Sequence, residues 1–145
     1  MQRRGWHQQF KRRPAADRTC DGFVFASVGE MQRWIFLREW EKRGYISGLK
    51  RQVRYQFILP DGTEIRYPGT RHNHKGVLAT YTSDFEYTLT EKHAPSSGSN
   101  FAKEGHRVIE EYKGFDDGTG RLRRAVFEAI YKIKIRVVKK PTEAL

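Results

Sequence analysis

The stretch Val108-Ile109-Glu110-Glu111-Tyr112-Lys113-Gly114 decides how the rest of the chain is organised. It has the composition of a buried strand in which an acid and a lysine lie two residues apart. Successive side chains of a strand point to opposite faces, so Ile109, Glu111 and Lys113 are expected on one face and the residues between them on the other. At ~3.3 Å per residue, Glu111 and Lys113 are about 6.6 Å apart, too far for a close ion pair and suited to a shared ligand.

This acid and lysine suggest a reaction but do not establish one. A carboxylate that holds a divalent cation, beside an ammonium that orients or deprotonates a water molecule, is the minimum equipment for metal-assisted phosphodiester hydrolysis. Glu-x-Lys is nevertheless a common pair, and an edge strand with a cross-strand salt bridge is its more frequent explanation. The remaining sequence has to decide between the two.

Composition predicts one domain with a polyanionic partner. The 145 residues are 37% hydrophobic and 13% aromatic, which suffices for one core but not for two. The 28 Lys and Arg exceed the 17 Asp and Glu, which gives a net charge of +11. Nucleic acid is the commonest partner of such a chain. A membrane surface is disfavoured because no amphipathic helix gathers the basic residues opposite an apolar face.

The two ends of the chain are expected to lie outside the domain. Residues 1–20 hold six Arg and Lys against one Asp, which predicts an arm that is disordered when free and either follows a phosphate backbone or remains a solvated tail. The single domain is expected over residues 21–140, and residues 141–145 form a tail. Without an apolar run of 18 residues or a signal-peptide core, the protein is expected in the cytoplasm. The single Cys20 allows no intrachain disulfide and no cysteine-based zinc site.

The first regular element is predicted to be a helix. Ser27-Val28-Gly29-Glu30 is a capping box, and the helix is expected to run to Arg43 and stop at Gly44. Glu30 has two interpretations, since capping alone accounts for it while its place in the first turn can also direct a carboxylate toward the sheet. The apolar residues of this helix predict a wide face against the core: Met31, Trp34, Ile35, Leu37 and Trp40.

Alternating side chains predict the strands. Strands are expected over 52–59, over 64–67 after a turn, and over 77–88. On the last of these, Asp84 is a carboxylate in the middle of a sheet, which needs a partner or a metal unless that face is exposed. The Pro, Ser and Gly residues of 89–106 predict a surface loop, and pairing of the strands that it joins places Asp84 near Glu111.

The C-terminal part predicts a helix and a last strand. The helix is expected over about Arg121 to Tyr131, and its arginines oppose the helix dipole unless an anionic ligand is present. The strand is expected to alternate apolar residues, from Tyr131 to Val137, with Lys132 and Lys134. Those lysines form a second candidate phosphate contact.

The order helix, four strands, helix, strand, with its acids, resembles the PD-(D/E)XK nuclease superfamily. It is more similar to small phage-encoded proteins of that superfamily, in which a Ser-x-x-Glu helix start, a Gly-x-Ile-x-x-Leu-x-x-Gln stretch and a Lys-Gly-Phe recur. Here these are Ser27 to Glu30, Gly44 to Gln52 and Lys113 to Phe115, and the similarity covers about Phe25 to Val138. There are two departures, a long connector between the acids and Ser83 in place of a proline.

The resemblance implies a fold of the α/β (α+β) class, a restriction-endonuclease-like core with a central mixed sheet flanked by helices. It implies that Asp84 and Glu111 bind Mg²⁺ or Mn²⁺ with the backbone carbonyl of Tyr112, and that Glu30 reaches the metal directly or through water. Lys113 would orient the attacking water and stabilise the developing charge.

The implied function is a structure-specific DNA endonuclease, with a Holliday junction resolvase as the first choice among fork, flap and duplex-nicking enzymes. Cutting a four-way junction symmetrically implies a homodimer, for which the aromatic residues Trp34, Phe36, Trp40 and Tyr45 offer an apolar surplus. A basic DNA-binding module without chemistry is one alternative. Another is the His-Asn-His nuclease class, suggested by Arg71-His72-Asn73-His74. The basic residues expected to contact DNA are Arg3, Arg4, Lys11, Arg12, Arg13, Arg121, Arg123, Arg124, Lys132 and Lys134.

Overall fold

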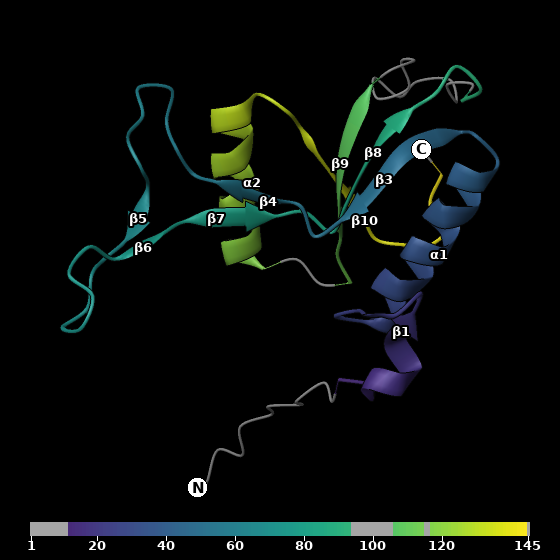
Figure 1. The fold of residues 1–145 in the computed structure, drawn as a ribbon, viewed down its shortest axis with the longest axis horizontal. Coiled ribbons are helices and arrows are strands. Elements are labelled where there is room, and N and C mark those ends of the chain that lie inside the picture. The colour runs from purple at the N-terminus through teal and green to yellow at the C-terminus, as the bar shows by residue number, and fades with distance from the viewer. Residues whose placement is uncertain (1–11, 94–105, 115–116, 145) are drawn as a thin grey trace, which may run out of the picture.

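A computed structural model describes residues 12–93, 106–114 and 117–144. Over these residues the fold is α+β, with a mixed central sheet and two α-helices (Figure 1). The sheet order is β10-β9-β8-β3, in which β9 runs parallel to β10 and β8 runs antiparallel to both β9 and β3. The bounds of these strands are β3 (Ile46–Arg51), β8 (Phe85–Leu89), β9 (Arg107–Tyr112) and β10 (Ile135–Val138).

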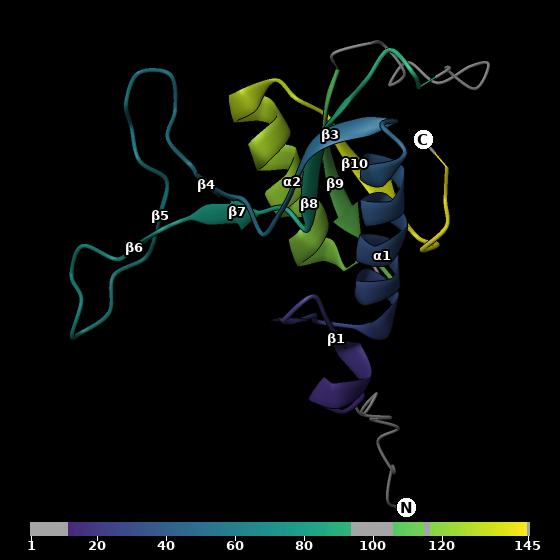
Figure 2. The same ribbon diagram turned by 45° about the vertical axis from the view of Figure 1, so that its right-hand side comes forward.

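The helices α1 (Val28–Lys42) and α2 (Gly118–Tyr131) lie on opposite sides of the sheet (Figure 2). Alternation along β9 supplies both interfaces. Val108 joins the core under α1 with Trp34, whereas Ile109 joins the core under α2 with Phe127. The predicted division of β9 into two faces is therefore confirmed.

The first helix begins and ends as the sequence predicts, to within one residue. Ser27 Oγ accepts from the Glu30 amide at 3.1 Å, but the Glu30 carboxylate accepts from the amide of Ala26 instead of closing the box on Ser27. Gly44, with φ of 77°, follows the cap. The predicted apolar face is wrong at Ile35, which is 48% exposed, whereas Arg33 is fully buried.

The long strand predicted over 77–88 is broken into three. They are β6 (Val77–Leu78), β7 (Thr80–Thr82) and β8. Continuous alternation would place Tyr81 and Phe85 on one face, yet Tyr81 packs under α2 and Phe85 under α1. Asp84 lies in the break, so it comes directly before a strand of the central sheet and not within one.

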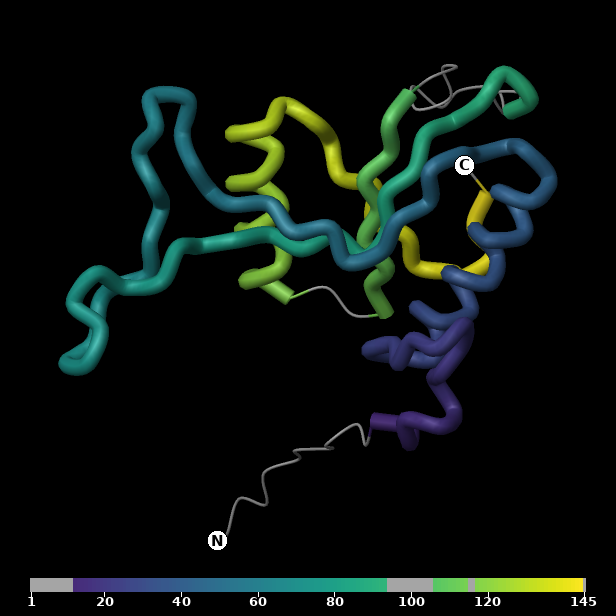
Figure 3. Tube along the Cα trace, in the orientation of Figure 1, coloured from purple at the N-terminus to yellow at the C-terminus, as the bar shows by residue number. Residues whose placement is uncertain are grey.

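The other predicted strands are shorter than expected and leave the sheet. The strand predicted over 52–59 is reduced to β4 (Arg54–Gln56), which pairs with β7, and that over 64–67 to β5 (Arg66–Tyr67), which pairs with β6. Together they extend away from the central sheet (Figure 3). The last strand begins at Ile135 and not at Tyr131, because α2 continues to Tyr131 and Lys132 takes a left-handed conformation.

Strand β3 was not predicted. Its sequence has no alternation, and Gly48 has a φ of 66°, at a shift in the pairing register between Ser47 and Lys50. Such a bulge interrupts the two-residue period on which strand prediction depends.

Both ends that were predicted to lie outside the domain contribute to the fold where the structure describes them. The expected arm, residues 1–20, contains a 3₁₀-helix over Ala15–Arg18 and β1 (Thr19–Cys20), which pairs with β2 (Phe23–Val24); residues 1–11 lie outside the described part. The expected tail supplies the carbonyls of Pro141 and Glu143 as acceptors for the buried guanidinium of α1. Within the described ranges, no helix is long and apolar enough to cross a membrane.

Candidate functional site

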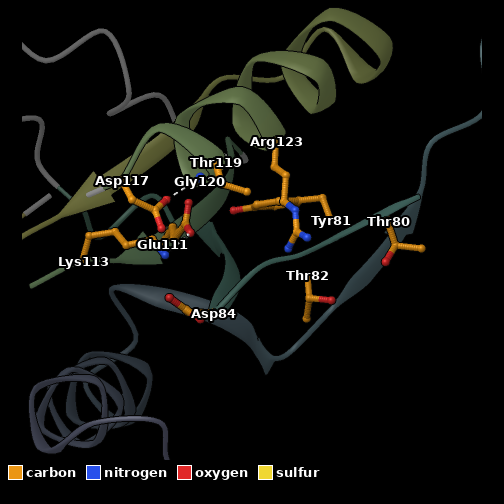
Figure 4. Close-up of a pocket in the computed structure, with 10 residues that line it drawn as sticks. All are labelled: Thr80, Tyr81, Thr82, Asp84, Glu111, Lys113, Asp117, Thr119, Gly120 and Arg123. Carbon is orange, nitrogen blue, oxygen red and sulfur yellow. Dashed lines mark hydrogen bonds and ion pairs between the residues drawn. The ribbon is translucent and has the colours of Figure 1, made fainter. Parts of the chain in front are cut away.

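Pairing of β8 with β9 fixes Asp84 against the end of β9. The Asp84 amide donates to the carbonyl of Glu110 at 3.2 Å, and Asp84 Oδ2 accepts from the amide of Tyr112 at 2.8 Å. Glu111 and Lys113 lie on either side of that amide in sequence. The predicted proximity of Asp84 to Glu111 and Lys113 is confirmed, and all three line one cavity (Figure 4).

Glu30 reaches the same region from the start of α1. The phenol of Tyr112 packs so closely on Gly29 that a Cβ there would overlap it, so glycine lets this turn approach β9. Gln52 Nε2 lies 3.4 Å from Glu30 Oε1, and the Gln52 amide donates to the carbonyl of Asp84 at 3.1 Å. Gln52 therefore connects the two acids. Sequence reasoning gave Gln52 no role, although its place in the quoted Gly-to-Gln stretch was a signal.

Glu111 is held by two cations. Lys113 Nζ lies 2.9 Å from Glu111 Oε1, and Arg124 Nη1 lies 3.0 Å from Glu111 Oε2. The prediction that Glu111 and Lys113 are too far apart for an ion pair is wrong, because the long lysine side chain bends back along the strand. Arg124 was predicted to contact DNA, and this is also corrected. Arg124 is only 8% exposed, and its guanidinium donates to Glu111 from the buried side of α2.

Burial raises the pKa values of Asp84 and Glu30, and repulsion from neighbouring acids adds to the shift at Asp84. Burial, and then the negative charge of Glu30, raise the pKa of Asp84 to about 7, and Glu111 adds to the shift. Burial likewise raises the pKa of Glu30, against the opposing effects of the Ala26 amide and of nearby cations. For Lys113, burial lowers the pKa, but the hydrogen bond and charge of Glu111 outweigh it and the pKa is raised overall.

The donor set fits a hard divalent cation chemically. Over the described ranges, no group of three or more His, Cys, Asp or Glu side chains is already arranged to hold a metal ion. Both Glu111 oxygens are occupied by ion pairs, and one Asp84 oxygen by an amide. Among the described residues the second Asp84 oxygen has no such partner, and burial disfavours the charged form of Asp84 and of Glu30, so a cation beside them would stabilise their charged forms. Carboxylate oxygens in such surroundings are suitable ligands for Mg²⁺ or Mn²⁺.

The cavity beside the acids has a volume of about 330 Å³. Its other walls come from β7 and from the first turns of α2, where the Asp117 carboxylate caps the helix by accepting from the Gly120 amide at 2.6 Å. Arg123, predicted to contact DNA, lines it and donates to the Tyr67 hydroxyl at 3.0 Å. The hydroxyls of Thr80 and Thr82 were not anticipated, and such groups commonly bind phosphate oxygens.

The remaining predicted DNA contacts are dispersed. Arg121 is exposed in the first turn-and-a-half of α2, but Lys132 and Lys134 do not form a lysine face of a strand because both precede β10. Lys134 instead pairs with Glu128 at 2.7 Å. Arg12 and Arg13 are exposed ahead of the 3₁₀-helix. The other predicted contacts lie outside the described residues: Arg3, Arg4 and Lys11.

Comparison of the chain with known protein families, with curated proteins and with solved structures finds no match. The assignment of a function therefore depends on the chemistry of the site itself.

Asp84→Asn is expected to stabilise the protein at pH 8 by about 2 kcal/mol, less than the full shift implies because the side chain is partly exposed. The folded-state pKa of about 7 exceeds the ordinary value of 3.8, so the folded protein binds more protons between these limits and loses stability as pH rises from about 4 to 7. The asparagine carries no charge and can still accept from the Tyr112 amide. Urea denaturation at pH 4 and pH 8 measures the difference.

Glu91→Gln is the control, because it removes a carboxylate from an exposed turn. This variant should keep the wild-type dependence of stability on pH. Equal stabilities of wild type and Asp84→Asn at pH 8 would contradict a raised folded-state pKa of Asp84.

Proposed function

We propose that the protein is a Mg²⁺-dependent DNA endonuclease of the PD-(D/E)XK type with a restriction-endonuclease-like core. The observation that carries the proposal is the meeting of Glu30, Asp84 and the Glu111-Lys113 pair, from α1, a strand break and β9, in a protein of net charge +11. Neither helix packing nor sheet formation requires three carboxylates there. The mixed sheet with a helix on each side is compatible with the proposed core.

Asp84 and Glu111, together with the Tyr112 carbonyl and Glu30, would hold the cation, which when bound polarises the scissile phosphate and lowers the pKa of a water molecule. Lys113 has a separate part. Because its pKa is raised, its ammonium keeps a proton near neutral pH and donates hydrogen bonds to the water or to a phosphate oxygen. A protonated Lys113 is suited to orient the water molecule and to stabilise the developing charge, and it is not suited to remove a proton from that water.

A DNA-binding module without chemistry is less well supported. Basic residues dispersed over the surface are sufficient to bind phosphate groups. A partly buried Asp84 with a pKa of about 7 lowers the stability of the fold at neutral pH and does not help to bind phosphate. The His-Asn-His alternative also loses support. His72 and His74 are exposed in the turn between β5 and β6, and the chain continues into a second strand and not into the helix that such a site needs.

The substrate is best tested by direct cleavage. Labelled four-way junction, fork, flap and duplex DNA are incubated with the protein and Mg²⁺, or with chelator, and the cuts are mapped. The proposal predicts metal-dependent nicks, with the four-way junction cut symmetrically. Failure to cleave any of these substrates with Mg²⁺ or Mn²⁺ would overturn the proposed endonuclease activity. Cleavage of only the fork or the flap would keep the activity but replace the four-way junction as the proposed substrate.

The active species is proposed to be a homodimer, because two symmetric nicks need two sites related by a two-fold axis. Of the aromatic residues expected at its interface, Trp34 is buried, whereas Phe36, Trp40 and Tyr45 are half-buried, and Trp40 contacts the other two at ring distances of 5.2 and 5.7 Å. The proposal therefore rests on the symmetry of the substrate. Light scattering with and without junction DNA should give twice 17.1 kDa of protein. A protein mass of one chain under both conditions would contradict the dimer.

A further inference from the structure

A second cavity, of about 300 Å³, is lined by Glu30 and Gln52, the two residues that connect it to the site described above. Three arginines line it: Arg12, Arg18 and Arg51. The described residues place no carboxylate within ion-pair distance of any of them, and the one acid that lines the cavity is Glu30. The cavity is therefore strongly basic and directly adjoins the acid cluster.

Two aromatic rings contact the guanidinium group of Arg51. Its guanidinium carbon lies 4.6 Å from the ring centroid of Phe23 and 4.7 Å from that of Phe25, so the side chain is held against β2 and the residue that follows it. Its Nε atom is buried and has no hydrogen-bond partner. A buried donor without an acceptor is costly, and the Arg51 guanidinium therefore keeps hydrogen-bonding capacity that no described residue uses.

The neighbouring arginines fix the wall and add charge. Arg18 donates to the carbonyls of Arg13 and Phe25, which ties the 3₁₀-helix to the residue after β2, at the wall of the cavity. Arg12 is exposed beside it. Arg51 and Arg12 line the same cavity as Glu30, and their charges favour its ionised form.

We propose that Arg51, with Arg12 and Arg18, binds a phosphate group of a DNA strand next to the phosphate positioned at Asp84 and Glu111. A guanidinium fork matches phosphate oxygens, and its aromatic support lowers the entropy lost on binding. The inference rests on the proposed function, because the phosphate bound in this cavity belongs to the same DNA strand as the phosphate that is cut. The phosphate is either an internal phosphodiester or a terminal 5′-phosphate, two sources with the same chemistry.

The test is a scan of DNA strands that carry one neutral methylphosphonate at successive positions on each side of the cut. Wild-type affinity should fall about tenfold at one position near the cut, because a charge-assisted contact is lost. Arg51→Gln should already bind about tenfold more weakly and show no further loss at that position. Arg51→Lys keeps the charge without the fork and should lie between them. Junctions with and without a 5′-phosphate identify the terminal source.

Lys42→Gln is the matched control. It removes one positive charge from an exposed position in the last turn of α1, about 18 Å along the helix axis from Glu30 and away from the cavity that Arg51 lines. This variant should show the wild-type profile at every methylphosphonate position. Thermal melting followed by circular dichroism establishes that each variant is folded, and Arg51→Lys decides the question if Arg51→Gln does not fold.

Calorimetric titration with inorganic phosphate in the absence of DNA separates this inference from the proposed function. Phosphate binding that is lost in Arg51→Gln supports the cavity even if no DNA is cut. The wild-type protein could cut DNA while Arg51→Gln shows the same methylphosphonate profile as wild type. That result would overturn the assignment of the cavity as a phosphate site and leave the proposed endonuclease activity intact. Phosphate binding unchanged in Arg51→Gln and Arg51→Lys would also overturn it.

Discussion

Asp84→Asn, Glu111→Gln and Lys113→Ala are each expected to reduce DNA cleavage by at least ~10²- to 10³-fold, while DNA affinity stays within about tenfold of wild type. The acids would lose the charge that holds a cation, and the alanine would lose the ammonium that orients water. Affinity depends on many dispersed basic residues, so no one of these changes removes it. Single-turnover cleavage and equilibrium binding on the same junction measure the two effects.

Asp61→Asn is the control for these variants, since it removes a carboxylate from the exposed turn between β4 and β5. It should cleave at the wild-type rate. Glu30→Gln should lose less activity, and its stability should change little because the glutamine oxygen can still accept from the Ala26 amide at the helix start. Near wild-type cleavage by any of the three principal variants would show that the site is assigned wrongly.

Arg33→Leu is expected to destabilise the fold by about 3–5 kcal/mol. Arg33 is fully buried, and its Nε and Nη2 donate to the two oxygens of Glu110 at 2.6 and 2.8 Å. The leucine would leave a buried carboxylate with the Tyr87 hydroxyl, at 2.7 Å, as its closest remaining donor. It would also release the carbonyls of Pro141 and Glu143. Such a loss is a large fraction of the stability of a small domain.

Urea denaturation at neutral pH measures this loss, and Arg43→Ala provides the comparison. Arg43 pairs with Glu39 on the exposed surface of α1, so its removal should cost less than about 1 kcal/mol. Adding Glu110→Met to Arg33→Leu should recover part of the stability, because it removes the unpaired charge. A loss below 1 kcal/mol for Arg33→Leu would mean that Glu110 is not held as the structure shows.

The adjacent acids Glu110 and Glu111 have different surroundings because β9 is buried on both faces. Glu110 points toward α1, where Arg33 neutralises it. Glu111 points toward α2 and the cavity, where Lys113 and Arg124 hold it. The first acid is therefore expected to matter for stability and the second for activity, a difference that the two predictions above measure independently.

Local rules in the sequence were sufficient for much of this arrangement. The capping motif at Ser27 and the glycine at Gly44 located α1, because helix ends are determined by hydrogen bonds over a few residues. The two-residue period of β9 correctly separated Glu111 from Glu110, since alternation is a property of a single strand. The proximity of Asp84 to Glu111 followed from pairing of the strands on either side of one loop.

Tertiary contacts decided what local patterns could not. Arg33 and Arg124 look like surface charges in the sequence, yet each is buried because an acid on β9 reaches it from a distant part of the chain. The break at Asp84 and the approach of Gln52 to Glu30 depend on elements packed from different directions. Sequence by itself thus determined which acids and lysine share a strand face, whereas the packing of α1 and α2 on that strand decided which charges are neutralised and which remain available to a ligand.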